Sequence, residues 1–220
     1  MGIEKQKRIQ QSLLAPYEKK VLLYLAAKMP AWINSDHLTL LGFVAACLSG
    51  LFYYFARFDH IYLWWVNGMI FLNWFGDSLD GTLARYRNKQ RPRYGYYVDH
   101  ILDAIGTSAI LWGMAFSGYI NTNLALAVLC VYLVMSINSY LSASVFESFQ
   151  ISYWRFSPTE LRVLMIIGNT FIFFKPIVHI LGIPYLMFNI AFLVGLLLLS
   201  IMLVFHTIKN IIILYNQERI

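Results

Sequence analysis

Charged side chains are scarce in this chain of 220 residues: Asp, Glu, Lys and Arg make up 13% of it, whereas hydrophobic residues make up 59%. A soluble domain carries about 25% charged residues. The deficit excludes an ordinary water-soluble globular protein and indicates that lipid surrounds most of the chain.

Cysteines are few, and signal-peptide features are lacking. Cys47 and Cys130 lie in apolar stretches without motif spacing, which excludes a disulfide framework and favours small buried hydrophobic residues. The first 30 residues contain several lysines but no compact apolar core with a cleavage site, so we expect no cleaved signal. The net charge of +6 is concentrated beside hydrophobic runs, which is typical of membrane topology and not of nucleic-acid binding.

What is present is a series of hydrophobic runs. A bilayer core needs roughly 20 apolar residues in a helix, and six runs reach about that length. They are residues 38–56, 61–83, 95–120, 123–146, 161–181 and 185–208. We therefore expect an all-α membrane protein with six transmembrane helices. Its parts are an N-terminal segment (1–37), the six-helix domain (38–209) and a tail (210–220).

The connections between the runs alternate in charge. Five cations and no acid occur in residues 85–93, whereas residues 58–60, 119–122 and 182–184 are short and nearly neutral. By the positive-inside rule, this multi-pass protein has the basic loop and both termini in the cytoplasm.

An amphipathic helix is expected before the first span. Leu14, Tyr17, Val21, Leu22 and Leu25 recur at helical spacing beside lysines. This pattern predicts a helix on the cytoplasmic membrane surface. An ordinary juxtamembrane helix packed on the protein fits the pattern equally well.

Four of the 11 acidic residues lie within 27 positions, at the cytoplasmic ends of the second and third runs: Asp77, Asp80, Asp99 and Asp103. An ionisable group at membrane depth costs about 2.5–3.5 kcal/mol. Neighbouring carboxylates also repel one another, so a compensating cation is needed. Residues that carry this penalty are expected to be functional.

Helical spacing gathers these acids on two faces. One face, at offsets 0, 3, 4, 7 and 8, consists of Asp77, Asp80, Gly81, Ala84 and Arg85. The other, at offsets 0, 4 and 8, consists of Gly95, Asp99 and Asp103. Because the basic loop joins the two helices as a hairpin, the acidic faces can meet. Converging carboxylates suit Mg²⁺, Mn²⁺ or Ca²⁺ rather than zinc.

The same faces carry the other parts of phosphoryl-transfer chemistry. Gly81, Ala84 and Gly95 let a ligand approach the helix backbone, and Arg85 can clamp a phosphate. Metal ions neutralise diphosphate charge, while a spare carboxylate accepts a proton from the attacking hydroxyl. A salt-bridge network between the acids and the loop arginines is the alternative, but it does not explain the small residues on the same faces.

Residues 77–85 read DSLDGTLAR and residues 95–103 read GYYVDHILD. Together they closely resemble the signature of the CDP-alcohol phosphotransferase (CDP-alcohol phosphatidyltransferase) family, D-x-x-D-G-x-x-A-R followed by G-x-x-x-D-x-x-x-D. Residues 34–42, NSDHLTLLG, are similar to the stretch before that family's first span. The spacer, residues 86–94, is one residue longer than is usual, and we expect the basic loop to absorb it.

The resemblance covers essentially the whole chain and implies roles for the motif. The first three aspartates of the family bind metal, which here implies Asp77, Asp80 and Asp99 as ligands of Mg²⁺ or Mn²⁺, with two ions conceivable. Asp103 would be the general base and could also contact a metal ion. The resemblance further implies a CDP-linked donor, an alcohol acceptor, CMP release and a homodimer. The residues expected to hold the donor are Gly81, Ala84, Arg85 and Gly95.

Two donor geometries exist in this family. CDP-diacylglycerol can donate its phosphatidyl group to a small polar alcohol, or CDP-choline or CDP-ethanolamine can donate a head group to diacylglycerol. His100, directly after Asp99, and Glu160 resemble features of the second group, although a packing histidine and an acid favoured at a helix start explain them equally well. Arg162 could hold an acceptor phosphate. The compact length favours the first geometry, which we expect.

A divalent-cation transporter is the alternative from another class. It would need acids along a path to the far side of the membrane, but the acids gather at the cytoplasmic end and the opposite loops are nearly bare of charge.

Overall fold

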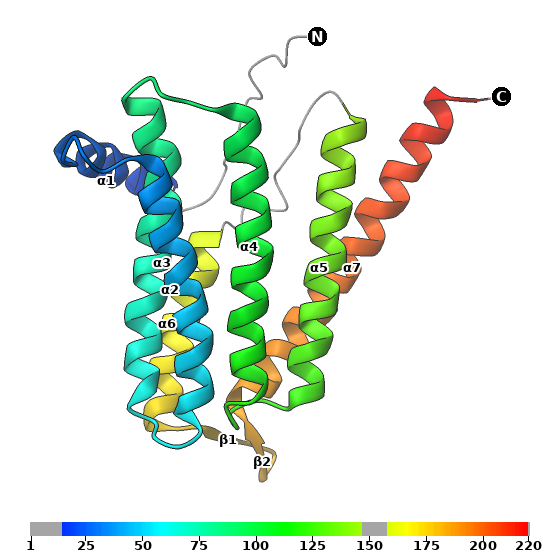
Figure 1. Ribbon diagram of the computed structural model, residues 1–220. Coiled ribbons are helices and arrows are strands. Elements are labelled where there is room, and N and C mark those ends of the chain that lie inside the picture. Colours follow the sequence, from blue (N-terminus) through cyan, green and yellow to red (C-terminus); the bar gives the residue numbers. More distant parts are fainter. Residues whose placement is uncertain (1–14, 147–157, 220) are drawn as a thin grey trace.

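The computed structural model describes residues 15–146 and 158–219, and this part of the chain is built almost wholly of helices (Figure 1). A helix lies in each of the six runs that the sequence predicts as spans, so the predicted helical architecture is confirmed in these elements. In chain order the elements are α1 (Ala15–Lys28), α2 (Ser35–Ala56), α3 (Tyr62–Tyr86), α4 (Pro92–Ala115), α5 (Thr122–Val145), α6 (Pro158–Phe174), β1 (Ile177–Ile180), β2 (Ile183–Leu186) and α7 (Met187–Gln217).

Within the described residues, α2, α5 and α7 are the helices long and apolar enough to cross a membrane. Such helices mark the chain as an integral membrane protein. The helices α3 and α4 reach 25 and 24 residues but carry charged side chains, and α6 has 17 residues. Six spans, and their orientation, therefore stay predictions.

The run expected as the fifth span, residues 161–181, is not helical throughout. The helix α6 ends at Phe174, because Pro176 has no amide hydrogen and its ring does not fit into a continuing helix. An antiparallel hairpin of β1 and β2 follows, with Ile177 opposite Leu186. Both residues of its turn, Leu181 and Gly182, have positive φ angles of 52° and 81°, as a tight two-residue turn requires.

The helices α3 and α4 both pack on α2, more extensively than on each other. Glycines make these contacts close: a Cβ on Gly76 of α3 would lie 2.6 Å from the backbone nitrogen of Gly42. A Cβ on Gly113 of α4 would collide with the backbone of Gly50. The helix α2 therefore holds the two motif helices and sets their spacing.

Buried polar side chains fasten α6 to this group. The Tyr53 hydroxyl donates to Asn169 Oδ1 at 2.8 Å, and Asn169 Nδ2 donates to Asn67 Oδ1 at 2.9 Å. Asn67 Nδ2 in turn donates to Thr170 Oγ1 at 3.3 Å. In an apolar surrounding each of these groups needs a partner, so the network joins α2, α3 and α6 in one arrangement.

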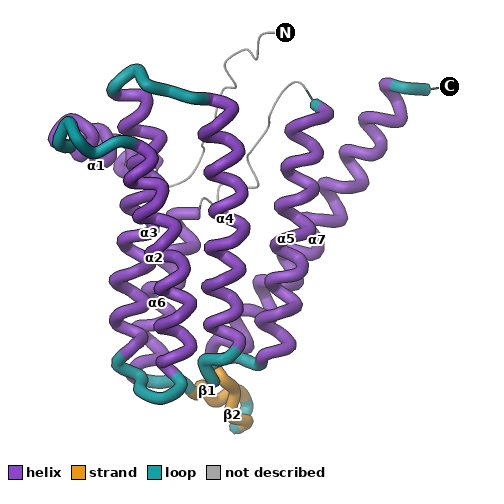
Figure 2. The backbone as a smooth tube through the Cα atoms, viewed as in Figure 1, coloured by secondary structure: helices purple, strands orange, loops and turns teal. Residues whose placement is uncertain are grey.

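The helix α1 lies across the end of the bundle at which the α3–α4 loop and the end of α7 are found (Figure 1). The hairpin and the α2–α3 and α4–α5 loops lie at the opposite end (Figure 2). In α1, Leu22 and Ala26 are buried in a cluster with Leu38 and Leu79, while Tyr17 and Val21 are exposed. The helix thus packs on the protein through one face, and its contact with a membrane surface stays a prediction. Leu14 lies outside the described residues.

Candidate active site

The two halves of the motif are held on separate helices with defined ends. The helix α3 closes with a left-handed residue, Asn88 (φ 53°), and the Lys89 amide donates to the Ala84 carbonyl at 2.9 Å, a C-terminal arrangement that satisfies the last carbonyls. Proline at the first position then starts α4 at Pro92. Gly95, and with it the second half of the motif, therefore lies wholly inside α4 in spite of the longer spacer.

Three acids converge between these helices. One carboxylate oxygen each from Asp77, Asp99 and Asp103 lie within 4.8 Å of one another. Asp77 and Asp99 are half-buried, and Asp103 is exposed. Oxygens bound to one ion at opposite positions are about 4.2 Å apart around Mg²⁺ and about 5 Å apart around Ca²⁺. Only one pair of the three can be opposite, and adjacent oxygens lie closer, about 3 Å apart around Mg²⁺, so the three carboxylates have to draw together to bind one hard cation.

Asp80 lies beside this cluster with its own partners. Thr39 Oγ1 of α2 donates to Asp80 Oδ2 at 2.6 Å, and the Gly81 amide contacts Oδ1. Asp77 and Asp99 are close enough to interact with Asp80 electrostatically. Thr39 was not among the predicted site residues, and its place in residues 34–42, the stretch that resembles the family, was the available signal.

Arg162 forms an ion pair with Asp77, with Nη2 2.6 Å from Oδ2. Only 15% of the arginine side chain and 23% of the aspartate side chain are exposed, so the pair is largely removed from solvent. Its positive charge reduces the repulsion among the acids. The charge on Arg162 alone does not neutralise three carboxylates, which leaves the cluster suited to a cation.

The residues predicted to bind the donor differ in their surroundings. Arg85 is exposed, donates to Thr82 Oγ1 at 3.1 Å and lies over Gly81, where an added Cβ would be 3.3 Å from Nη1. Ala84 is half-buried. Nothing lies within 4 Å of a Cβ added at Gly95, so the backbone there is open to a ligand.

His100 is packed between aromatic rings. Its ring centroid lies 4.1 Å from that of Tyr96 and 5.1 Å from that of Tyr140. Nδ1 lies 2.7 Å from the Tyr96 carbonyl and donates to it, because a carbonyl oxygen only accepts. These contacts agree with the packing alternative for His100. Glu160 is half-buried in the first turn of α6, two residues before Arg162.

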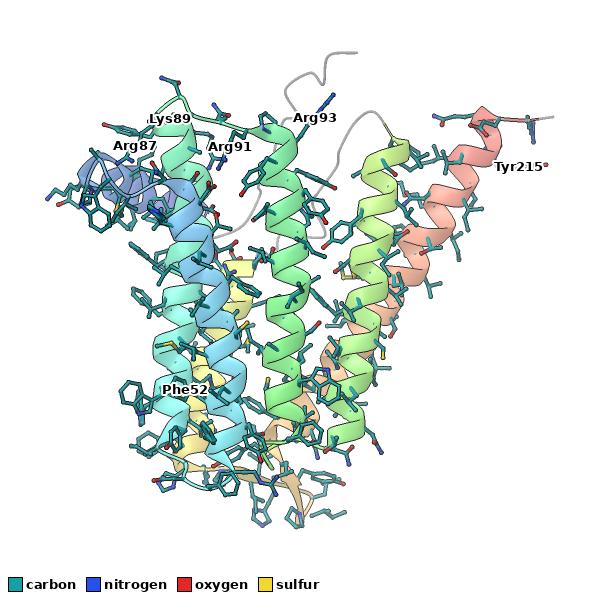
Figure 3. All side chains as sticks on the ribbon, viewed as in Figure 1. Phe52, Arg87, Lys89, Arg91, Arg93 and Tyr215 are labelled. Atoms are coloured by element: carbon teal, nitrogen blue, oxygen red, sulfur yellow. The ribbon has the colours of Figure 1, made fainter. Side chains whose placement is uncertain are left out.

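Two cations of the basic loop hold the N-terminal part in place. Figure 3 shows Arg87, Lys89, Arg91 and Arg93 at the end of the bundle where the α3–α4 loop lies. Arg87 donates to the carbonyls of Met29 and Pro30 at 2.8 and 2.9 Å, at the end of α1. Arg91 forms an ion pair with the exposed side chain of Asp36. Arg87 and Arg91 therefore make structural contacts, in addition to contributing to the positive charge of the loop.

Hydroxyl groups of α5 lie near Asp103. Tyr132 hydrogen-bonds the side chains of Thr107 and Ser136 and is near enough to Asp103 and Arg162 to interact with them electrostatically. Sequence reasoning missed these residues, since a tyrosine and a serine in an apolar run look like ordinary packing residues.

Comparison with known proteins agrees with this geometry. The sequence profile of the family described as CDP-alcohol phosphatidyltransferase matches residues 32–214. A curated protein of Cutibacterium acnes (strain DSM 16379 / KPA171202), phosphatidylinositol phosphate synthase, is 33% identical over 120 residues. That match covers 53% of this chain and 56% of the other protein, so the chain spans about half the length of this relative. Because the profile extends over most of the sequence and includes both halves of the aspartate motif, the chain belongs to the CDP-alcohol phosphatidyltransferase family.

Proposed function

We propose that the protein transfers the phosphatidyl group of a CDP-diacylglycerol to a small polar alcohol and releases CMP. The convergence of Asp77, Asp99 and Asp103 is the observation that carries this proposal. Family membership and the name of the Cutibacterium relative support the same chemistry.

In this proposal Asp77, Asp80 and Asp99 hold Mg²⁺ or Mn²⁺, and Asp103, which converges with Asp77 and Asp99, also contacts the metal. The bound metal supplies charge neutralisation for the diphosphate of the donor. Asp80 keeps its orientation through Thr39, and Asp77 shares one oxygen with Arg162. Arg85 binds the phosphates of the donor beside Gly81, Ala84 and Gly95.

Asp103 is the general base of the proposed reaction. Its exposed carboxylate takes the proton of the acceptor hydroxyl, whose oxygen forms the new bond to the phosphorus of the phosphatidyl group. The bond between that phosphorus and the bridging oxygen breaks, and CMP leaves with that oxygen.

Arg162 favours an acceptor that itself carries a phosphate. It is a half-buried cation next to Asp103, with the hydroxyls of Tyr132 and Ser136 nearby. A guanidinium group binds a phosphate dianion well, and hydroxyls suit a polyol. We therefore propose a phosphorylated polyol such as inositol phosphate or glycerol phosphate as the acceptor.

The membrane arrangement of the proposal has six spans. The N-terminal helix lies on the cytoplasmic surface, and the site and both termini face the cytoplasm. A homodimer is part of the same proposal. The grouping of the basic loop and α1 at one end of the bundle supports this orientation.

A CMP-release assay tests the proposed function. Purified protein with Mg²⁺ or Mn²⁺ is given CDP-diacylglycerol, CDP-choline or CDP-ethanolamine, each with inositol phosphate, glycerol phosphate, serine or diacylglycerol. We expect CMP from CDP-diacylglycerol with a phosphorylated polyol. Release from CDP-choline or CDP-ethanolamine with diacylglycerol would move the assignment to the second donor geometry.

A cation transporter is separated from the enzyme by a binding measurement. CDP-diacylglycerol or CDP should raise the melting temperature of the enzyme in detergent, because a ligand that binds only the folded state stabilises it. No shift and no CMP from any pair of substrates, together with Mn²⁺ uptake into vesicles, would support transport instead.

A further inference from the structure

Three helices are joined by hydrogen bonds at one half-buried carboxylate, Glu18. Glu18 Oε1 of α1 accepts a hydrogen bond from Trp74 Nε1 of α3 at 2.8 Å and from Ser78 Oγ at 3.2 Å. It also accepts from Thr159 Oγ1 of α6 at 2.8 Å. Glu18 is half-buried, in the first turn of its helix. An ionised carboxylate has only acceptor sites, so it matches three converging donors.

The partners of Glu18 belong to the segments that carry the site. Ser78 follows Asp77 directly in the motif, and Thr159 lies one helical turn before Arg162. Since Arg162 pairs with Asp77 at 2.6 Å, the contacts close a ring from α1 to α6 to α3 and back to α1. The ring fixes the start of α6, the end of that helix nearest the aspartates.

The opposite half of α6 is fixed separately. Asn169 and Thr170 of α6 hydrogen-bond the side chain of Asn67 of α3. Along α6, these two residues lie roughly two turns from Arg162. Without Glu18, the ion pair between Arg162 and Asp77 would still hold the first turn of α6. However, the carboxylate of Asp77 is also a ligand of the proposed metal ion. A tether that does not involve Asp77 is therefore needed to keep Arg162 in place when a cation competes for that carboxylate.

We propose that Glu18 is a positioning residue, which through Thr159 holds Arg162 at the acceptor side of the active site. This inference rests on the proposed function. It assigns to α1 a part in acceptor recognition, in addition to packing on the bundle.

The test uses the full chain with CDP-diacylglycerol as donor and inositol phosphate as acceptor, or glycerol phosphate if the wild type uses that acceptor. Glu18→Ala should raise the KM for the acceptor about tenfold, the loss expected when a hydrogen bond to a charged group is removed. The Kd for CDP-diacylglycerol should stay within about twofold of wild type, because the donor residues are on α3 and α4. Lys19→Gln, an exposed neighbour on the same helix, is the matched control and should leave both constants unchanged.

Thr159 provides a second and milder variant. Thr159→Val removes only the hydroxyl and should raise the acceptor KM, whereas Thr159→Ser should restore it. In the double variant Glu18→Ala/Thr159→Val, the rise should be no larger than in Glu18→Ala alone, because both changes break one contact.

Two results would overturn the inference. One is an acceptor KM that is unchanged in Glu18→Ala and Thr159→Val. The other is a rise in the acceptor KM that is accompanied by a comparable loss of donor affinity and by a lower melting temperature. A purely structural role of Glu18 would give that result. Failure of the proposed function is distinct, because there the wild-type protein releases no CMP with any acceptor.

Discussion

The helices α2, α3 and α4 meet with backbone against backbone, whereas α7 leans on α5 with most of its apolar side chains exposed. At Gly50 and Gly113 there is no room for a Cβ, while a Cβ at Gly195 of α7 would meet nothing within 4 Å. The first region sets the distance between the acids and has to be rigid. The second region presents Leu197, Ile201 and other apolar side chains to the surroundings, as a helix in lipid does.

The largest expected effect comes from the acids that the first region holds. Asp99→Asn should lower CMP release about 10³-fold or more, because a neutral ligand weakens the metal that stabilises charge in the transition state. It should also abolish the rise in melting temperature with Mn²⁺. Asp59→Asn, in the exposed α2–α3 loop, is the control and should behave as wild type. Full turnover in folded Asp99→Asn would contradict the metal assignment.

Asp103→Asn should lower kcat by about 10²–10⁴-fold, the usual contribution of a general base. Donor binding should persist, since the other acids remain. The measurement is the Kd for CDP-diacylglycerol beside single-turnover CMP release. Loss of both binding and turnover would leave the base role of Asp103 unsupported.

One methyl group added to each region tests the difference between the α2–α3–α4 contact and the α5–α7 contact directly. Gly113→Ala forces α4 away from Gly50 and should destabilise the fold by about 1–3 kcal/mol or more, with loss of activity. Gly195→Ala should change neither melting temperature nor CMP release. Equal behaviour of the two variants would refute the close α2–α4 contact.

Arg85→Ala should weaken donor binding about tenfold, as expected for the loss of one charge-assisted hydrogen bond, with a smaller change in kcat. Arg93→Ala, an exposed cation at the start of α4, serves as the matched control. An unchanged donor Kd in Arg85→Ala would remove Arg85 from the site.

The smallest effect is expected between α5 and α7. Asn210 Nδ2 donates to Ser142 Oγ at 2.7 Å. Asn210→Leu should cost only about 0.6 kcal/mol, the average for a hydrogen bond between membrane helices. Asn169→Leu in the α2–α3–α6 network should cost more, because its amide makes two bonds in a buried position. Chemical unfolding in mixed micelles compares the two, and a greater loss from Asn210→Leu would reverse the ranking of the two regions.

Much of the helical layout is predictable from the sequence, because apolar runs and the Pro and Asn residues at helix ends are local signals. The end of α3 just before Asn88 and the start of α4 at Pro92 follow from such residues. The hairpin after Pro176 was missed, since its apolar residues read as more of the same span. The burial of Leu22 and Ala26 of α1 could not be predicted either, because an amphipathic pattern does not say whether lipid or protein covers the apolar face of a helix.

By itself, the sequence determined which side chains are too costly in a membrane to be incidental, and it placed Asp77 and Asp80 on one helix face and Asp99 and Asp103 on another. Helical periodicity is enough for that. Only the tertiary structure decided that α2 holds these faces together, that Arg162 reaches Asp77, that Thr39 donates to Asp80, and that Glu18 accepts from Thr159. The reason is physical: contacts between residues 41 to 141 positions apart depend on how helices pack, and no local pattern encodes that packing.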